Sequence, residues 1–120
     1  KKWIVDPDII ADFRNMPFED NRFKLVVFDP PHIKSITAGA IMAQKYGRLF
    51  PSWETDLKAG FDECMRVLEP YGILIFKWNE ANIKVSKILD VLKCTPLFGH
   101  PTNKNGTTHW FCFMKLPINE

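Results

Sequence analysis

Residues 23–32 read Phe-Lys-Leu-Val-Val-Phe-Asp-Pro-Pro-His, and this stretch decides the fold that the sequence predicts. Five of its first six residues are apolar. Such a run of β-branched and aromatic residues is typical of a strand buried on both faces, as in a parallel sheet. The strand must end at Pro30, because proline has no backbone N–H and a fixed φ. Asp29 is therefore expected at the carboxyl end of the strand, the edge of an open α/β sheet where ligands bind.

Composition and charge fit a single globular domain. The 120 residues are 46% hydrophobic and 25% charged, with a formal net charge of +2, which are ordinary values for such a domain. This charge is too small to indicate nucleic-acid binding by itself, and no apolar run approaches the roughly 20 residues that span a bilayer. The cysteines lack metal-ligand spacing and are expected to be buried thiols of a reducing compartment. We therefore expect a cytoplasmic protein without a membrane partner.

A helix and a second strand are predicted after the Asp29 strand. Apolar residues of 53–68 recur every three or four positions behind Ser52, a favourable N-cap, and Pro70 stops the helix. Residues 73–77, Ile-Leu-Ile-Phe-Lys, then form another apolar strand. The order strand, helix, strand predicts a parallel pair joined by a right-handed crossover. The carboxyl end of this second strand brings three further candidates: Lys77, Trp78 and Asn79. For Trp78 the alternative is a structural role, because a tryptophan at a strand end often caps the core.

Other elements are expected on both sides of this unit. Residues 8–12, Asp-Ile-Ile-Ala-Asp, look like a short buried strand that ends in Asp12. Residues 83–92 have helical periodicity. Strands at 96–100 and 107–115 flank a polar turn with an Asn-Gly pair, which predicts a hairpin. The fold class is therefore α/β, with a mostly parallel sheet and an antiparallel carboxyl-terminal hairpin.

A long connection, residues 33–52, separates the Asp29 strand from the helix. It is basic and aromatic, with Lys34 and Tyr46 as candidate substrate contacts, and residues 38–46 could form a brief helix. Long loops at the ligand edge of a sheet are often functional. Two interpretations stay open for this connection, a lid that contacts the substrate and an ordinary solvated loop.

Asp-Pro-Pro followed by His resembles motif IV of the class I S-adenosylmethionine-dependent methyltransferases that methylate exocyclic amino groups. In that family the carboxylate and a proline carbonyl accept hydrogen bonds from the target NH₂, and an aromatic fourth residue stacks on the substrate. The resemblance implies that Asp29, Pro30, Pro31 and His32 form the catalytic motif. His32 departs from the family's Tyr, Trp or Phe, which leaves stacking possible but weaker. The alternative role for His32 is to take part in proton removal. The alternative interpretation is an acidic turn that ends a strand, because Asp-Pro commonly opens turns.

Two further stretches resemble the same family. Residues 66–74, Arg-Val-Leu-Glu-Pro-Tyr-Gly-Ile-Leu, are similar to the Arg-Val-Leu-Lys-Pro-Gly-Gly element before its fifth strand, with Tyr71 in place of a glycine. Asp12-Phe13 and the Met-Pro-Phe of residues 16–18 match the segment before motif IV. By this resemblance the cofactor is S-adenosyl-L-methionine, whose adenine amino group donates a hydrogen bond to Asp12. The implied cofactor contacts are Asp12, Phe13, Phe28 and Asp29. A solvated strand-end aspartate is the alternative for Asp12.

The family's glycine loop and its ribose-binding acidic residue have no counterpart in this sequence, which lacks Gly-x-Gly and has its first glycine at Gly39. The resemblance therefore implies that residues 1–120 are a single partial methyltransferase domain with a Rossmann-like sheet, truncated at the N-terminus. No metal is expected, since His100 and His109 are nine residues apart without a third ligand nearby and are interpreted as structural.

The implied reaction is methyl transfer to an amino nitrogen. A nucleic-acid base of the N6-adenine or N4-cytosine type is the expected target, which makes nucleic acid a possible partner. The substrate contacts expected from the sequence are Lys34, Tyr46, Lys77, Trp78 and Asn79. The alternatives are a methyltransferase for a protein or small-molecule substrate and a non-catalytic binding domain on a degenerate version of the fold.

Overall fold

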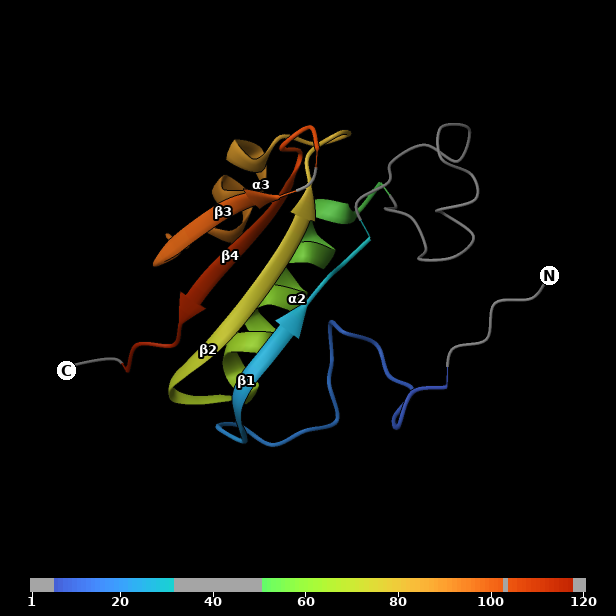
Figure 1. The fold of residues 1–120 in the computed structure, drawn as a ribbon. Coiled ribbons are helices and arrows are strands. Elements are labelled where there is room, and N and C mark those ends of the chain that lie inside the picture. The colour runs from blue at the N-terminus through green and yellow to red at the C-terminus, as the bar shows by residue number, and fades with distance from the viewer. Residues whose placement is uncertain (1–5, 32–50, 103, 118–120) are drawn as a thin grey trace.

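The computed structural model describes residues 6–31, 51–102 and 104–117 (Figure 1). Its elements are β1 (Phe23–Phe28), α2 (Trp53–Val67), β2 (Leu68–Asn79), α3 (Val85–Leu92), β3 (Phe98–Thr102) and β4 (Thr108–Met114). The strands form one sheet in the order β1-β2-β4-β3. Within the described ranges, no helix is both long and apolar enough to cross a membrane.

The pairing of the strands confirms the α/β fold class, although only one of the three pairings between the described strands is parallel. β1 runs parallel to β2, to which α2 connects it, and Phe28 is paired with Phe76. β4 runs antiparallel to both β2 and β3, so the carboxyl-terminal hairpin forms as predicted. Lys77 and Trp110 are direct partners in the β2–β4 register.

Both helices lie on the same face of the sheet (Figure 1). Alternate residues of β2 point into the layer between sheet and helices, and Leu74, Phe76 and Trp78 are completely buried there. They pack in one cluster with side chains of α2 and α3, including Leu57, Phe61, Ile88 and Leu92. The periodicities that predicted the two helices therefore mark the faces that build the core.

The opposite face of the sheet carries no helix among the described residues. Leu25 and Val27 of β1 lie on it with 57% and 60% of their surface exposed, whereas Phe28 is buried. The prediction of a strand buried on both faces is therefore wrong for the part of the chain described here. An apolar run shows that a strand is suited to double burial, but neighbouring elements determine whether both faces are covered.

The strand predicted at residues 8–12 is also wrong. The backbone bends there instead of pairing, and Ile10 is 90% exposed. Two consecutive parallel strands need a crossover of a dozen or more residues, and only residues 13–22 separate this segment from β1. The connection is too short to return the chain to the start of a parallel neighbour.

Smaller differences concern element ends. β2 begins at Leu68, five residues earlier than predicted, since Leu68 already pairs with Phe23 before an irregularity in the register. Consequently α2 ends before Pro70 is reached. α3 starts at Val85, and β3 extends to Thr102 into the predicted turn. The brief helix expected at 38–46 lies outside the described residues.

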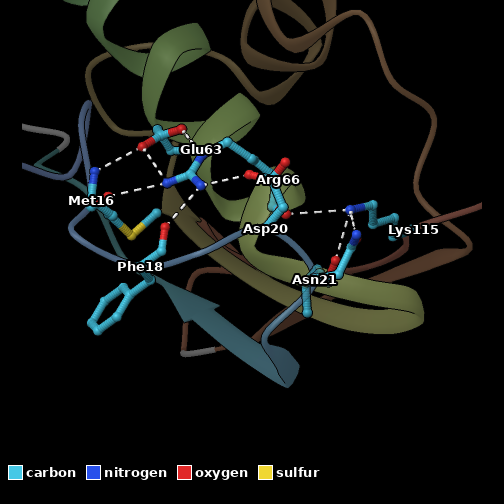
Figure 2. Close-up of polar contacts among 8 residues, drawn as sticks. Met16, Phe18, Asp20, Asn21, Glu63, Arg66 and Lys115 are labelled. Atoms are coloured by element: carbon cyan, nitrogen blue, oxygen red, sulfur yellow. Dashed lines mark hydrogen bonds and ion pairs between the residues drawn. The ribbon is translucent and has the colours of Figure 1, made fainter.

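The connection that leads into β1 is fastened to the end of α2 by Arg66 (Figure 2). The Arg66 guanidinium donates to the Glu63 carboxylate at 2.6 Å, and to the Phe18 carbonyl and the Asp20 carboxylate, each at 2.8 Å. Glu63 also accepts the Met16 backbone N–H at 2.7 Å. These contacts fix where β1 starts. They lie at the amino end of the strand, opposite the end that carries Asp29.

Lys115, which follows the end of β4, also binds the connection that leads into β1 (Figure 2). Its ammonium donates to the Asn21 side chain and to the Leu68 carbonyl, both at 2.7 Å. Asn21, with a φ of 58°, donates its backbone N–H to the Arg66 carbonyl at 3.0 Å. The left-handed conformation, which asparagine tolerates well, turns the chain sharply into β1.

Tyr71 and Gly72 form the turn inside the long β2 strand. A Cβ atom at Gly72 would lie 2.8 Å from the Glu69 carbonyl oxygen, so glycine is needed there for close approach. Tyr71 has a φ of 66° and an exposed side chain, in a conformation that costs a non-glycine residue about 1–2 kcal/mol. Tyr71, which stands where the similar methyltransferase element has its first glycine, therefore has a strained backbone.

We predict that Tyr71→Gly is more stable than Tyr71→Ala by about 1 kcal/mol, because both variants lose the exposed ring but only glycine relieves the left-handed backbone. The free energy of unfolding in urea measures the difference. Equal stability of the two variants would show that this turn is not strained.

Candidate functional site

Asp29 directly follows Phe28, the last residue of β1. Phe28 is buried and its ring centroid lies 5.7 Å from that of Phe76. Pro30 is buried as well, whereas the Asp29 side chain is 49% exposed. The carboxylate is therefore held by a rigid backbone between buried residues and remains accessible at the sheet edge. Pro31 is half-buried, and His32 lies outside the described residues.

The parallel register brings Lys77 to the side of Asp29. Because Phe28 pairs with Phe76, the next residue of each segment points to the open face. Lys77 Nζ lies 3.6 Å from Asp29 Oδ2. The structure therefore joins two residues that the sequence analysis placed at two separate strand ends.

Trp110 is the third member of this site, and the sequence analysis did not single it out. Lys77 Nζ lies 5.3 Å from the centroid of the Trp110 ring, within cation–π range. The Trp110 indole N–H donates to Thr102 Oγ1 at 3.1 Å, which fixes the ring against β3. Trp110 lies beside Lys77 because of the β2–β4 register, which no local sequence pattern reveals.

A ligand can displace the ion pair between Asp29 and Lys77. Both side chains are substantially exposed, and ion pairs of this kind typically contribute only about 0.2–1 kcal/mol. A ligand that offers an amino group to Asp29 therefore competes with a weak contact. Chemically, the site combines a hydrogen-bond acceptor, a cation and an aromatic face.

Trp78 and Asn79 have structural contacts. Trp78 is completely buried, its indole N–H donates to the Ile83 carbonyl at 3.0 Å, and its ring is stacked near that of Phe76. Asn79 donates to Thr108 Oγ1 at 3.0 Å and accepts the Ala81 backbone N–H at 2.9 Å. The structure therefore places Trp78 in the core and gives Asn79 the role of closing the turn after β2.

Phe13 packs beside the end of β1. Its ring centroid lies 5.5 Å from that of Phe28. A Cβ atom at Gly60 of α2 would lie only 2.3 Å from the Phe13 ring, so this glycine makes room for the phenylalanine. The Asp12-Phe13 segment is consequently held against both α2 and the strand that carries Asp29.

Arg14 orients the Asp12 carboxylate. Its backbone N–H and its Nε both donate to Asp12 Oδ1 at 2.9 Å. Arg14 Nη1 also donates to Asp56 Oδ1, in the first turn of α2, at 3.0 Å. The Ser52 hydroxyl donates to the second oxygen of Asp56 at 2.8 Å. The sequence analysis missed Arg14 and Asp56 because residues 42 positions apart cannot be paired by local pattern.

These hydrogen bonds keep the acidic groups ionised. Donation by the Arg14 side chain lowers the pKa of Asp12 to about 2 from an ordinary value of 3.8. The pKa of Asp56 is also lowered, first by the Ser52 hydroxyl and then by Arg14. The Asp12 carboxylate is therefore charged and able to accept hydrogen bonds at neutral pH, with part of its capacity already used by Arg14.

We predict that Arg14→Gln raises the pKa of Asp12 from about 2 toward 3.8, because the principal donor to the carboxylate is lost. A carboxyl ¹³C NMR titration measures this pKa. The native ion pair supports the folded state above pH 3.8 and loses this effect as the pH falls through 2. An unchanged Asp12 titration in the variant would show that Arg14 does not control this carboxylate.

Two further candidates cannot be placed relative to the site, and one histidine has a contact elsewhere. Lys34 and Tyr46 lie outside the described residues. His109 Nε2 lies 2.8 Å from Glu80 Oε2, at the turn after β2. Hydrogen bonds from the Val85 backbone and from His109 lower the pKa of Glu80. Within the described ranges, no cluster of three or more His, Cys, Asp or Glu residues could hold a metal ion.

Neither a family model nor a curated protein matches the chain, but solved structures do. The PH0226 protein from Pyrococcus horikoshii OT3 has a TM-score of 0.63 at 16% identity, over 88% of this chain and 57% of that one. TTHA0409, a candidate DNA modification methylase from Thermus thermophilus, has a TM-score of 0.56 at 18% identity, over 92% and 54%. A further structure of TTHA0409 contains S-adenosyl-L-methionine.

A candidate sarcosine dimethylglycine methyltransferase from Galdieria sulphuraria is also similar, with a TM-score of 0.50 at 17% identity, over 88% of this chain and 58% of that one. At these identities the likeness is one of fold. The chain therefore has the Rossmann-like methyltransferase fold that its sequence predicted. It spans little more than half the length of each of these structures.

Proposed function

We propose that this chain carries the substrate side of an S-adenosylmethionine-dependent methyltransferase that acts on an amino nitrogen, with the exocyclic amine of a nucleic-acid base as the target. The observation that supports this proposal most is the exposed Asp29 carboxylate, held between buried Phe28 and buried Pro30 at the carboxyl end of β1. Ligands of open α/β sheets bind at this edge.

Asp29 and the Pro30 carbonyl orient the target in this proposal. Both accept hydrogen bonds from the NH₂ group, which directs the nitrogen lone pair away from the protein. The negative carboxylate also stabilises the positive charge that develops on nitrogen during methyl transfer. His32, Lys34 and Tyr46 remain proposed contacts of the same substrate.

The cofactor supplies an electrophilic methyl group when it is bound. The chain offers residues that suit its adenosine part, since Asp12 is an ionised acceptor and Phe13 is held beside Phe28. We further propose that the glycine loop and the ribose-binding acidic residue of such enzymes lie outside these 120 residues. The 54–58% coverage of the similar structures supports this part of the proposal.

We also propose a cytoplasmic location. Cys64 and Cys112 are buried free thiols, and burial raises the pKa of Cys64 to about 12. Such unreactive thiols suit a reducing compartment.

Replacement of Asp29 tests the proposed function. The variants are made in the protein encoded by the native reading frame. Asp29→Ala should lower the rate of methyl transfer to adenine- or cytosine-containing oligonucleotides by about 10²–10³-fold, which is the usual effect of removing one preorganised electrostatic group. Asp29→Asn keeps one acceptor oxygen and should retain more activity. Transfer of a labelled methyl group from S-adenosylmethionine measures both rates.

Asp90→Ala is the matched control, because Asp90 is an exposed aspartate of α3 away from this sheet edge. It should leave the rate unchanged. Full activity of Asp29→Ala, with unchanged thermal stability, would refute the assigned role of Asp29. Absence of methyl transfer by the wild-type protein on nucleic-acid, protein and small-molecule amines would favour a non-catalytic binding domain.

A further inference from the structure

One residue from each of β2, β4 and β3, together with the residue that follows β1, forms a row across the open face of the sheet. Lys77 is paired directly with Trp110, and Trp110 with His100. Directly opposite residues of antiparallel strands point to the same face. Asp29 completes the row beyond β1, where it contacts Lys77 at 3.6 Å. We call Asp29, Lys77, Trp110 and His100 the edge row.

The chemistry of the open face changes abruptly at the edge row. The neighbouring row of paired residues is apolar and consists of Val27, Ile75, Cys112 and Phe98. Cys112 follows Trp110 by two residues because β4 is antiparallel, and the other three each precede their edge-row residue by two. The edge row instead combines a carboxylate, an ammonium, an exposed indole ring and an imidazole. Polar recognition groups on this part of the face are therefore concentrated at the carboxyl end of β1 and β2.

Lys77 occupies the position between the two outer recognition groups. Its ammonium lies 5.3 Å from the Trp110 ring centroid and 3.6 Å from the Asp29 carboxylate. An exposed cation–π contact is weaker than the stacking of a base on an aromatic side chain. A planar ligand can therefore replace the ammonium over the ring, and the displaced ammonium remains available for an anionic group of the same ligand.

We propose that the edge row binds one nucleotide unit, with the base stacked on Trp110, the phosphate paired with Lys77 and the exocyclic amine directed to Asp29. This inference rests on the proposed function and adds the residues that hold the base and the phosphate at that site. Adjacent strands are about 4.8 Å apart, so Asp29 and Trp110, separated by Lys77, are roughly 10 Å apart. A glutamine side chain has no aromatic face to cover the indole, which favours a nucleotide over a protein amide.

An NMR titration of the ¹⁵N-labelled 120-residue chain tests the inference. The probes are 2′-deoxyadenosine 5′-monophosphate and 2′-deoxyadenosine, and the readout is the separate indole N–H signal of Trp110. We expect a saturable shift of this signal with the nucleotide. Trp110→Ala, followed through backbone amides of β4, should weaken binding by at least about fivefold. Lys77→Met should weaken binding of the nucleotide more than binding of the nucleoside.

Matched variants control for general effects. Phe98→Ala removes another exposed aromatic ring of the same face, and Lys24→Met removes an exposed lysine of the same sheet; both should bind like the wild type. Asp12→Asn tests whether the nucleotide binds instead at the site proposed for the adenine of the cofactor, which contains Asp12. Nucleotide binding that Asp12→Asn abolishes but Trp110→Ala leaves intact would overturn the inference, as would absence of any saturable shift.

The two proposals fail in different ways. If the nucleotide binds at Trp110 but methyl transfer does not depend on Asp29, the edge row stands and the proposed reaction falls. If methyl transfer depends on Asp29 while Trp110→Ala binds the nucleotide as tightly as the wild type, the reaction stands and the edge row is wrong.

Discussion

The parallel pairing of β1 with β2 is the constraint on which the site depends. With Phe28 opposite Phe76, two buried rings lock the register from the helix side, and the next residue of each segment must face the open side. Asp29 and Lys77 meet for this reason alone. A shift of β1 by one residue would turn Asp29 toward the core and Phe28 toward solvent, and would separate Asp29 from Lys77.

Two arginines then hold the preceding segment in place from opposite ends of α2. Arg66, at its last turn, binds the connection that enters β1, and Arg14 ties Asp12 to Asp56 in its first turn. The irregular segment before β1 thus follows the helix without forming regular structure. Such fastening explains how Asp12 and Phe13 reach the end of β1 although the predicted strand there does not form.

The sequence predicted those elements whose signal is local. Helical periodicity marked α2 and α3, and the double proline marked the end of β1 and hence Asp29. Residues whose role depends on a distant partner were missed. Trp110 joins the site because the strand register pairs it with Lys77, and Arg14 because it donates a hydrogen bond to Asp56. Trp78, predicted as a substrate contact, is a core residue, because a tryptophan at a strand end looks the same in sequence whichever face it occupies. His32, Lys34 and Tyr46 stay predictions.

We propose that this fold serves methyl transfer. The most direct test is calorimetry of S-adenosyl-L-methionine binding to the protein encoded by the native reading frame. Saturable binding with one molecule per chain, weakened when Asp12 is replaced by Asn, is the predicted result. An absence of binding heat across several temperatures, with the protein folded, would contradict the claim and leave Asp29 as the end of a structural strand.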